Sequence, residues 1–413
     1  MKRLFSFMLV LVMSLTLIAC GKSPSAAASL DVADKSTQAA TSVVQVDPET
    51  VSTASEVPEA EQGPDWSKIN PLTGEAVEQD ISKNRPIAVM LNNIRQSLPQ
   101  SGNSQADVLY EVPEEGGITR IMALYQDITD VGYLGSIRST RPYYVQLAVA
   151  ADSILVHAGG SGKAYKTIQK YMKKSDFTDL DFLSKDTRTA ETIFWREQSR
   201  FDAGYASEHT LFTSSDKIQE YLEEHQEEIR LDHKDNYQFV HTFSQDATPT
   251  DGLDGKELNV NFSGYKSTSF TYSEESEKYL VSQFDSAYMD EAAGQQVAVT
   301  NVIVILTDIT ETGNAKNHVD IDIVGRGNGY YFNGGKYEPI IWSKVDVRDT
   351  YKFYKADGKT LFDLGVGKTF VCIVDKSRDI TVDGTVLEKP TDATIRPDLA
   401  ESAPISEEEE ELY

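Results

Sequence analysis

The chain has 413 residues, a formal net charge of −26 at pH 7 and two cysteines. So acidic a protein repels phosphates, which argues against nucleic acid as a partner. The length exceeds what one hydrophobic core comfortably supports, so we expect two domains.

The first twenty residues have the layout of a secretion signal. Two basic residues precede an apolar run from Leu4 to Ile18, which ends in the motif Leu17-Ile-Ala-Cys20. This motif is typical of bacterial lipoproteins, in which the cysteine is lipidated and becomes the first residue of the mature protein. We predict residues 1–20 as a lipoprotein signal peptide, with a lipid at Cys20 holding the protein on the extracytoplasmic face of the cell membrane. The alternative is an ordinary secretory signal, or a short membrane anchor, with an incidental cysteine.

Two segments have the composition of disordered chain. Residues 21–64 are rich in Ala, Ser, Thr, Glu and Pro without apolar periodicity, which predicts a tether. Residues 396–413 contain a run of five glutamates, and their mutual repulsion predicts an acidic tail. If Cys20 is lipidated, Cys372 has no disulfide partner; it lies in an apolar run and is expected in the core.

Residues 65–240 alternate between strand and helix patterns, which predicts a mixed α/β N-terminal domain. The expected strands are 86–91, 106–112, 119–125 and 154–157, and the expected helices are 143–151 and 215–230. Residues 241–255 are poor in apolar side chains and are interpreted as a linker.

Residues 256–395 consist almost wholly of strand patterns, which predicts a smaller, mainly antiparallel β domain. Tyr330-Tyr-Phe332 followed by Asn333-Gly-Gly335 indicates a strand that enters a tight hairpin. His318, Asp320 and Asp322 share one strand face, but apolar residues between them favour an ordinary half-exposed strand. We therefore predict no metal site and no cofactor.

Three clusters in the N-terminal domain carry the residue types of a ligand site, because each lies beside the end of an expected strand or helix. The candidate ligand-binding residues are Glu111, Glu114, Arg120, Arg138, Ser139, Arg141, His157, Gly159, Gly160 and Ser161.

The stretch His157 to Ala164 resembles a nucleotide-binding loop but lacks two of its required residues. The pattern G-x-x-x-x-G-K-[ST] needs glycine where His157 stands and a hydroxyl where Ala164 stands. We expect the glycines between them to allow backbone with positive φ or a close approach of a ligand or neighbouring segment. Their amides could still form a concavity for an anion.

The charged residues of these clusters allow a binding and a structural interpretation. Arg138 and Arg141 precede Pro142, a favoured first residue of a helix, so both could hold a carboxylate or phosphate there. Alternatively they pair internally with Asp107, Glu111 or Glu114. Glu111, Glu114 and Glu115 could also supply a carboxylate pair for cleavage of a glycan, with Glu111 or Glu114 and His157 as the acid–base groups.

Several long motifs resemble one known family. The runs R-P-I-A-V-M-L-N-N, S-G-x-S-Q-A-D-V-L-Y-E-V, E-G-G-I-T-R, G-S-I-R-S-T-R-P-Y and V-H-A-G-G-S are similar to those of the YerB-like lipoproteins, the DUF3048 family. The resemblance is strong over about 70–240 and looser in the later part. It implies an extracytoplasmic lipoprotein of two domains and names no reaction.

These observations favour a membrane-anchored binding module for an anionic envelope component, such as a cell-wall fragment, or for an envelope protein. The first alternative is a hydrolase of envelope glycan that uses Glu and His as acid–base groups. The second is a scaffold for other envelope proteins, with the β domain as the docking surface. The sequence leaves open whether there is any catalytic activity.

Overall fold

The computed structural model describes residues 64–172, 177–183 and 192–389. The predicted signal peptide with Cys20, the predicted tether up to residue 63 and the predicted acidic tail lie outside the described residues. In the described ranges, no helix is both long and apolar enough to cross a membrane.

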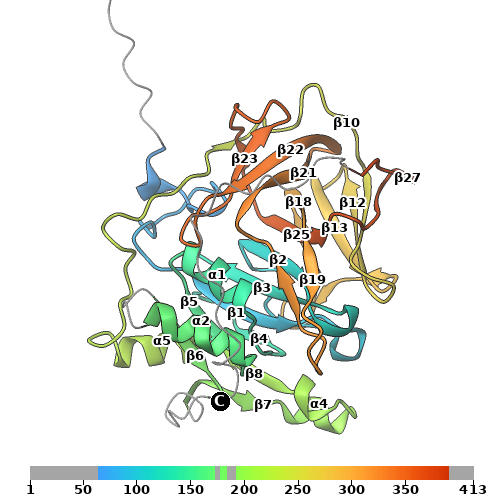
Figure 1. Ribbon diagram of the computed structural model, residues 1–413. Coiled ribbons are helices and arrows are strands. Elements are labelled where there is room, and N and C mark those ends of the chain that lie inside the picture. Colours follow the sequence, from blue (N-terminus) through green and yellow to red (C-terminus); the bar gives the residue numbers. More distant parts are fainter. Residues whose placement is uncertain (1–63, 173–176, 184–191, 390–413) are drawn as a thin grey trace, which may run out of the picture. The chain divides into compact units, whose positions relative to one another are not determined.

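A mixed sheet of eleven strands forms the centre of the described part of the chain. In spatial order its strands are β10 (Leu253–Asp254), β22 (Lys336–Lys344), β21 (Gly325–Asn333), β18 (Asn301–Thr307), β25 (Thr369–Asp375), β2 (Val108–Pro113), β3 (Thr119–Tyr125), β1 (Ile87–Asn92), β5 (Ile154–His157) and β6 (Thr178–Asp181), with β23 (Lys352–Lys355) beside β22. The parallel pairing of β2 with β25 sets Val108 opposite Thr369. One sheet therefore runs through both halves of the chain (Figure 1).

Both faces of the middle of this sheet are buried. All six residues of β1 are buried, and they alternate between two apolar clusters: Val89 and Leu91 belong to one, Ala88 and Met90 to the other. A strand buried on both faces reads as a continuous apolar run, because neither face needs polar side chains.

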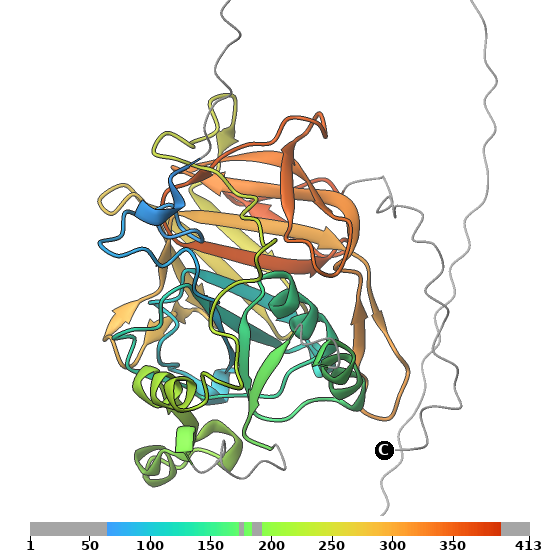
Figure 2. The ribbon, with the colours of Figure 1, turned by 90° about the vertical axis from the view of Figure 1, so that its left-hand side faces the viewer.

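Two helices cover one face. α1 (Pro142–Ala150) and α2 (Gly162–Met172) lie together beside the strands of the N-terminal half (Figure 1, Figure 2). α1 begins with Pro142, whose fixed φ suits the first helical position. The hydroxyl of Tyr144 on α1 donates to the carbonyls of Val112 and Arg120, at 3.1 and 3.0 Å. These bonds fix the helix to the ends of β2 and β3.

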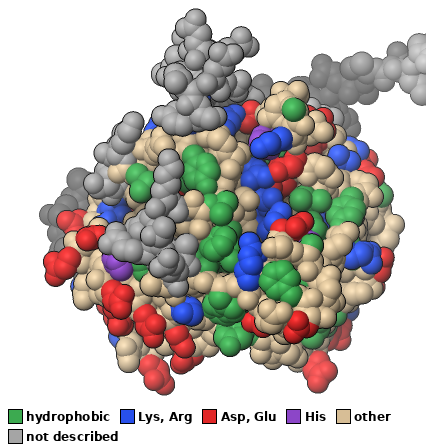
Figure 3. Space-filling model, turned by 90° about the horizontal axis from the view of Figure 1, so that it is seen from below, with side chains coloured by type: hydrophobic (Ala, Val, Ile, Leu, Met, Phe, Trp, Pro, Cys, Tyr) green, Lys and Arg blue, Asp and Glu red, His purple; other side chains and the backbone are tan. Residues whose placement is uncertain are grey.

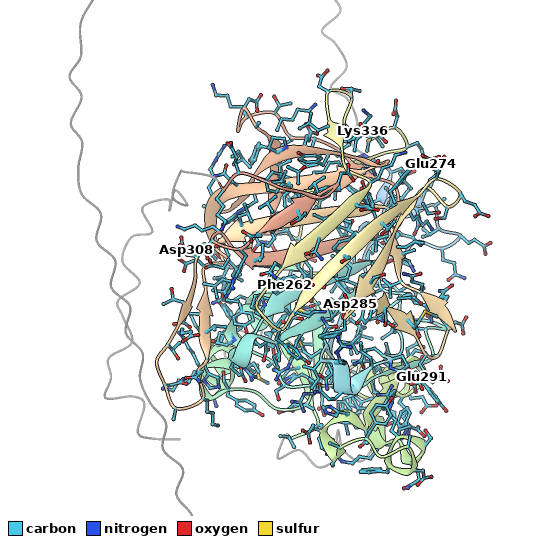
Figure 4. The ribbon with its side chains drawn as sticks, turned by 90° about the vertical axis from the view of Figure 1, so that its right-hand side faces the viewer. Phe262, Glu274, Asp285, Glu291, Asp308 and Lys336 are labelled. Carbon is cyan, nitrogen blue, oxygen red and sulfur yellow. The ribbon has the colours of Figure 1, made fainter. Side chains whose placement is uncertain are left out.

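A second, antiparallel sheet covers the other face (Figure 4). Its strands are β14 (Ser286–Ala287), β13 (Lys278–Gln283), β12 (Ser267–Ser273), β11 (Glu257–Asn261), β26 (Ile380–Val382) and β27 (Thr385–Val386), with β17 (Ala298–Val299) beside β13. Leu258, Val260 and Phe270 point into the same cluster as Leu109 of β2. The rings of Phe270 and Phe370 lie 5.0 Å apart, so the sheets are in direct contact.

Smaller elements surround this core. A three-stranded sheet joins β4 (Tyr133–Gly135), β8 (Leu211–Ser214) and β7 (Trp195–Arg196), and α4 (Gln198–Asp202) and α5 (Ser215–Glu224) adjoin it. The two-stranded pairs are β15 (Met289–Asp290) with β16 (Gln295–Gln296), β19 (Ile309–Glu311) with β20 (Val319–Ile321), and β9 (Phe243–Ser244) with β24 (Leu364–Gly365). Short 3-10 turns are η1 (Trp66–Lys68), η2 (Arg95–Ser97), η3 (Glu115–Gly117) and η4 (Ser207–His209).

The predicted class, mixed α/β followed by mainly antiparallel β, is confirmed. The segment 241–255, interpreted as a linker, contains β9 and β10, which pair with strands of the C-terminal half. The predicted helix 215–230 ends at Glu224, because the backbone of His225 leaves the helical conformation (φ −114°, ψ 18°) while its ring Nδ1 lies 2.8 Å from the carbonyl of Tyr221. The domain bounds 65–240 and 256–395 stay predictions.

Candidate functional site

A cavity of about 210 Å³ lies where the small sheet meets the loops that follow β4 and β5. Its lining residues include Arg138, Ser139, Phe182, Arg196, Glu208 and Leu211. β6, β7 and β8 lie at the lower end of the molecule in Figure 1. On the face seen from below, Lys and Arg side chains form a row among apolar ones, although the protein is strongly acidic (Figure 3).

Backbone hydrogen bonds bring two of the predicted clusters side by side at this cavity. The N–H of Ala158 donates to the carbonyl of Arg138 at 2.9 Å, and the N–H of Thr140 donates to the carbonyl of Gly159 at 2.8 Å. The N–H of Arg138 in turn donates to Met90 of β1 at 2.9 Å. Because β1 and β5 are parallel, their carboxyl ends open at one edge of the sheet, where α/β proteins commonly bind ligands.

Arg138 is the arginine of this motif that lines the cavity. Its Nη1 lies 3.4 Å from the backbone carbonyl of Glu208, and its Nε has no hydrogen-bond partner among the described residues. Within that same part of the chain, no carboxylate approaches its guanidinium to salt-bridge distance. Burial lowers the pKa of Arg138, and the neighbouring Arg120 adds to the effect. Arg138 therefore brings a partly buried positive charge to the cavity; the charges of Glu208 and Glu114 act on it, but within the described residues neither carboxylate is a counter-charge at salt-bridge distance.

Arg141 and Arg120 have such counter-charges. Nη1 of Arg120 lies 2.5 Å and Nη2 of Arg141 lies 3.2 Å from Oε2 of Glu114, whose side chain is 0% exposed. Arg141 also donates to both oxygens of Glu115, from Nε at 3.1 Å and from Nη2. Arg120 further donates to the carbonyl of Ser139 at 2.8 Å. Arg120, Arg141 and Glu114 are therefore paired with one another inside the protein and are not available to a ligand.

The pKa values of Glu114 and Glu115 are shifted in opposite directions. Burial raises the pKa of Glu114 to about 7, against the opposing charges of Arg120 and Arg141. Glu115 is less buried, so burial raises its pKa less than the hydrogen bond and charge of Arg141 lower it, to about 2. Glu115 thus stays ionised and paired with Arg141, which does not line the cavity.

His157 is fully buried and its ring is engaged on both sides. Nδ1 lies 2.9 Å from the carbonyl of Gly159, and Nε2 lies 3.0 Å from Oδ2 of Asp179. Because both nitrogens face acceptors, the doubly protonated ring is favoured. Burial lowers the pKa of His157, but the hydrogen bond and charge of Asp179 raise it by more, so the net shift is upward. His157 thus orders the loop from behind the cavity.

Asp181 holds the same loop from the next strand. Its Oδ1 accepts the N–H groups of Gly159 and Leu183 at 2.7 and 2.9 Å, and its Oδ2 accepts the Tyr165 hydroxyl at 2.8 Å. The backbone of the glycine-rich loop is therefore fixed by side chains rather than left open to a ligand.

Gly159 and Gly160 of this loop are glycines for different structural reasons. Gly159 has φ +81°, and a Cβ there would lie 2.8 Å from Leu183. A Cβ at Gly160 would lie 3.3 Å from Ala164, so Gly160 lets the loop approach helix α2. Ser161 accepts the N–H of Ala164 at 3.1 Å through its hydroxyl and so caps the start of α2.

Glu111 lies away from this cavity. It is buried between the two sheets, where its carboxylate accepts hydrogen bonds from Asn93, Thr119 and Thr268. Sequence reasoning missed Arg196 and Glu208, which reach the cavity from β7 and η4. Neither stands in a motif, and only tertiary folding brings them to the loops, so no local signal could have found them.

The protein is thus of the mixed α/β class, with two packed sheets and a cavity lined by Arg138 and Arg196 at one end of the central sheet. Family models described as "Protein of unknown function (DUF3048)", N-terminal domain and C-terminal domain, match residues 72–228 and 258–371. The chain belongs to this DUF3048 family.

A relative and a solved structure are similar over most of the chain. A Bacillus subtilis protein named "Putative lipoprotein YerB" is 30% identical over 319 residues, which are 74% of this chain and 85% of that protein. The crystal structure of YerB protein from Bacillus subtilis superposes with a TM-score of 0.63 at 27% identity, covering 76% of this chain and 99% of the solved chain.

Proposed function

We propose that this protein is a membrane-anchored extracytoplasmic lipoprotein whose cavity binds the anionic group of a cell-envelope component. The observation that carries the proposal is Arg138, which lines the cavity and lacks a carboxylate partner among the described residues. A partly buried guanidinium costs free energy to desolvate, and an anionic ligand would offset that cost through charge-assisted hydrogen bonds.

Apart from the acidic Glu208, the rest of the lining suits a small anion with an apolar part. Arg196 adds a second positive charge and Ser139 a hydroxyl, while Phe182 and Leu211 supply an apolar wall. The guanidinium of Arg196 lies 5.5 Å from the ring centroid of Phe182, which keeps it beside that wall. A volume of about 210 Å³ suits one sugar-sized group, so the ligand would insert one acidic unit of a larger envelope molecule.

The proposed anchor rests on the sequence and on a relative's name. The motif Leu17-Ile-Ala-Cys20 ends an apolar run, and the similar Bacillus subtilis protein is named as a lipoprotein. Lipid at Cys20 would hold the cavity outside the membrane, where envelope glycans and anionic polymers are found.

The hydrolase alternative has less support from the same geometry. General acid–base catalysis needs a group that can exchange a proton with substrate. Glu114 is buried against two arginines, Glu111 is buried between the sheets, and both nitrogens of His157 are engaged inside the protein. Binding is therefore the function that this arrangement supports best.

Calorimetric titration of the full-length protein in detergent, with N-acetylmuramic acid and with glycerol phosphate, tests the proposal. We expect at least one of these anions to bind, and Arg138→Gln to weaken that binding about tenfold or more, because a charge-assisted hydrogen bond contributes about 1.5–3 kcal/mol. Arg95→Gln makes the same change at an exposed position outside the cavity lining and should leave affinity unchanged. Absence of binding by both anions, or equal loss in both variants, would refute the proposed site.

A further inference from the structure

Three buried side chains from distant segments meet at one carboxylate oxygen between the two sheets. Asn93 follows β1, Glu111 lies in β2, and Lys266 precedes β12, in the turn that begins after Phe262, labelled in Figure 4. Oε1 of Glu111 accepts a hydrogen bond from Nδ2 of Asn93 at 2.9 Å and lies 3.3 Å from Nζ of Lys266. Asn93 and Glu111 are 0% exposed and Lys266 is 1% exposed.

The sheet register places these groups on the same side. Glu111 is opposite Ile121 of β3, so Thr119, two residues earlier, lies on the same face. The Thr119 hydroxyl donates to Oε1 of Glu111 at 2.7 Å, and Thr268 of the second sheet donates to Oε2 at 2.7 Å. Glu111 is therefore held rigidly, with Asn93 and Lys266 on fixed sides of it.

Asn93 and Lys266 each keep an unsatisfied atom. In the described part of the chain, neither Oδ1 of Asn93 nor Nζ of Lys266 has a hydrogen-bond partner. Nζ lies 4.6 Å from the ring centroid of Phe284, so an aromatic face covers it in place of water. Burial lowers the pKa of Lys266, although the charge of Glu111 opposes that shift. A desolvated amine of this kind is more nucleophilic than an exposed ammonium.

We propose that Lys266 and Asn93 become joined by an intramolecular amide bond, with Glu111 as the proton carrier. Glu111 takes one proton from the Lys266 ammonium, and the freed lone pair of Nζ attacks Cγ of Asn93. A second proton passes from Nζ through Glu111 to Nδ2, the Cγ–Nδ2 bond breaks, and Nδ2 leaves as ammonia. Glu111 ends neutral, the new amide keeps one N–H, and no outside reactant is required.

The bond links the two halves of the chain at their shared core. It closes a loop of roughly 170 residues, and long closed loops remove the most entropy from an unfolded chain. Cys372 is the free cysteine of the described residues and is buried, so a disulfide has no part in this link. Unlike a disulfide, the amide persists under reducing conditions. The reaction also removes a buried ammonium whose Nζ lacks a hydrogen bond.

Mass spectrometry of the denatured, full-length protein after tryptic digestion tests the bond. We expect one branched peptide that joins the segments of Asn93 and Lys266, about 17 Da lighter than its two parts because one ammonia is lost. Trypsin should also fail to cleave after Lys266, since its amine is acylated. Separate peptides with an intact Asn93 and cleavage after Lys266 in the wild-type protein would overturn the proposal, whatever the variants do.

Four variants test the chemistry. Lys266→Arg and Glu111→Gln should give separate peptides, since the first lacks the nucleophile and the second the proton carrier. Asn93→Asp should still give the branched peptide, now with loss of water, about 18 Da. Lys344→Arg is the matched control, because Lys344 is also buried but its Nζ donates to the backbone carbonyls of Val347 and Asp349 instead of facing a buried Glu and Asn. A branched peptide that survives Lys266→Arg, or is lost in Lys344→Arg, would contradict the assignment.

Discussion

Nη2 of Arg141 lies 3.2 Å from Oε2 of Glu114, a carboxylate with no exposed side-chain surface. Arg138, three residues earlier, lacks a carboxylate partner in the described residues and lines a cavity instead. The repeated arginines of Arg138-Ser-Thr-Arg141 therefore have different surroundings. We therefore expect substitution of Arg141 to lower stability and substitution of Arg138 to weaken ligand binding.

Arg141→Gln should destabilise the fold strongly. The substitution removes the ion-pair partner of Glu115 and one of the two partners of Glu114, which keeps Arg120. Breaking a buried ion pair costs about 3–5 kcal/mol, and the remaining Arg120 places the loss near the lower end of that range. Arg138→Gln should cost less than about 1 kcal/mol, because it breaks no ion pair in the described part of the chain. Urea unfolding of both variants at about pH 8, where Glu114 is largely ionised, measures the difference. Equal losses in the two variants would mean that Arg138 is structural as well.

The two glycines that flank the loop should respond oppositely to alanine. Gly159→Ala should destabilise by about 1–2 kcal/mol, because its φ of +81° is strained for any residue with a Cβ. Gly162→Ala should be neutral or stabilising by up to about 1 kcal/mol, because a Cβ there meets no atom within 4 Å and the residue begins helix α2.

Thermal unfolding of the two alanine variants gives the comparison directly. A drop in Tm at Gly162→Ala equal to that at Gly159→Ala would show that the loop tolerates no side chain anywhere, and that positive φ is not the reason. Anion binding by Gly159→Ala should also weaken, since Leu183, which its Cβ would contact, lines the cavity.

Local patterns in the sequence predicted single strands and turns better than they predicted which strands pair with one another. The buried run at 86–91 and the hairpin at Asn333-Gly-Gly335 are confirmed, because periodicity and turn chemistry are local properties. Gly334 and Gly335 both have positive φ, as a tight hairpin requires. The pairing of β2 with β25 joins residues far apart in the chain, and no period of two or 3.6 residues encodes such a partner.

The candidate site was predictable to a similar degree. The clusters at 138–141 and 157–161 indicated loops that meet, since strand ends in α/β proteins share an edge. Which arginine would be paired depended on where the turn after β2 places Glu114 and Glu115 in space, which no local pattern encodes. The position of Glu111 between the sheets, beside Lys266, depends on the second sheet and had no signal in its own motif.

The anchor can be tested apart from the fold. Replacing Cys20 with Ala should release the protein from the membrane or leave an unprocessed precursor, because acylation would have no acceptor. Membrane fractionation and intact mass of the wild type and of Cys20→Ala measure this. Cys372→Ala is the matched control, since Cys372 is buried and should not affect attachment. A wild-type protein without acyl groups would end the lipoprotein proposal and leave the cavity proposal standing.

His157 should make the stability of the protein fall as pH rises, because of its contact with Asp179. Its pKa in the folded protein is raised by Asp179 above the ordinary value, so folding favours the protonated ring. The resulting stabilisation is fully present below the unfolded pKa of about 6.5 and is lost as pH rises through the folded-state pKa. The free energy of unfolding of the wild type should therefore fall toward that of His157→Gln as pH rises.

Urea unfolding of the two proteins from about pH 5 to about pH 9 measures this difference. Asp179→Asn should flatten the same dependence while keeping the ring in place, because it removes the charge that raises the pKa of His157 and retains an acceptor for Nε2. Asp181 and its bonds to Gly159 and Tyr165 are unchanged in that variant. A stability difference that grows with pH would require His157 to be neutral in the fold. His157 would then have a basic nitrogen available, and the hydrolase alternative would regain support.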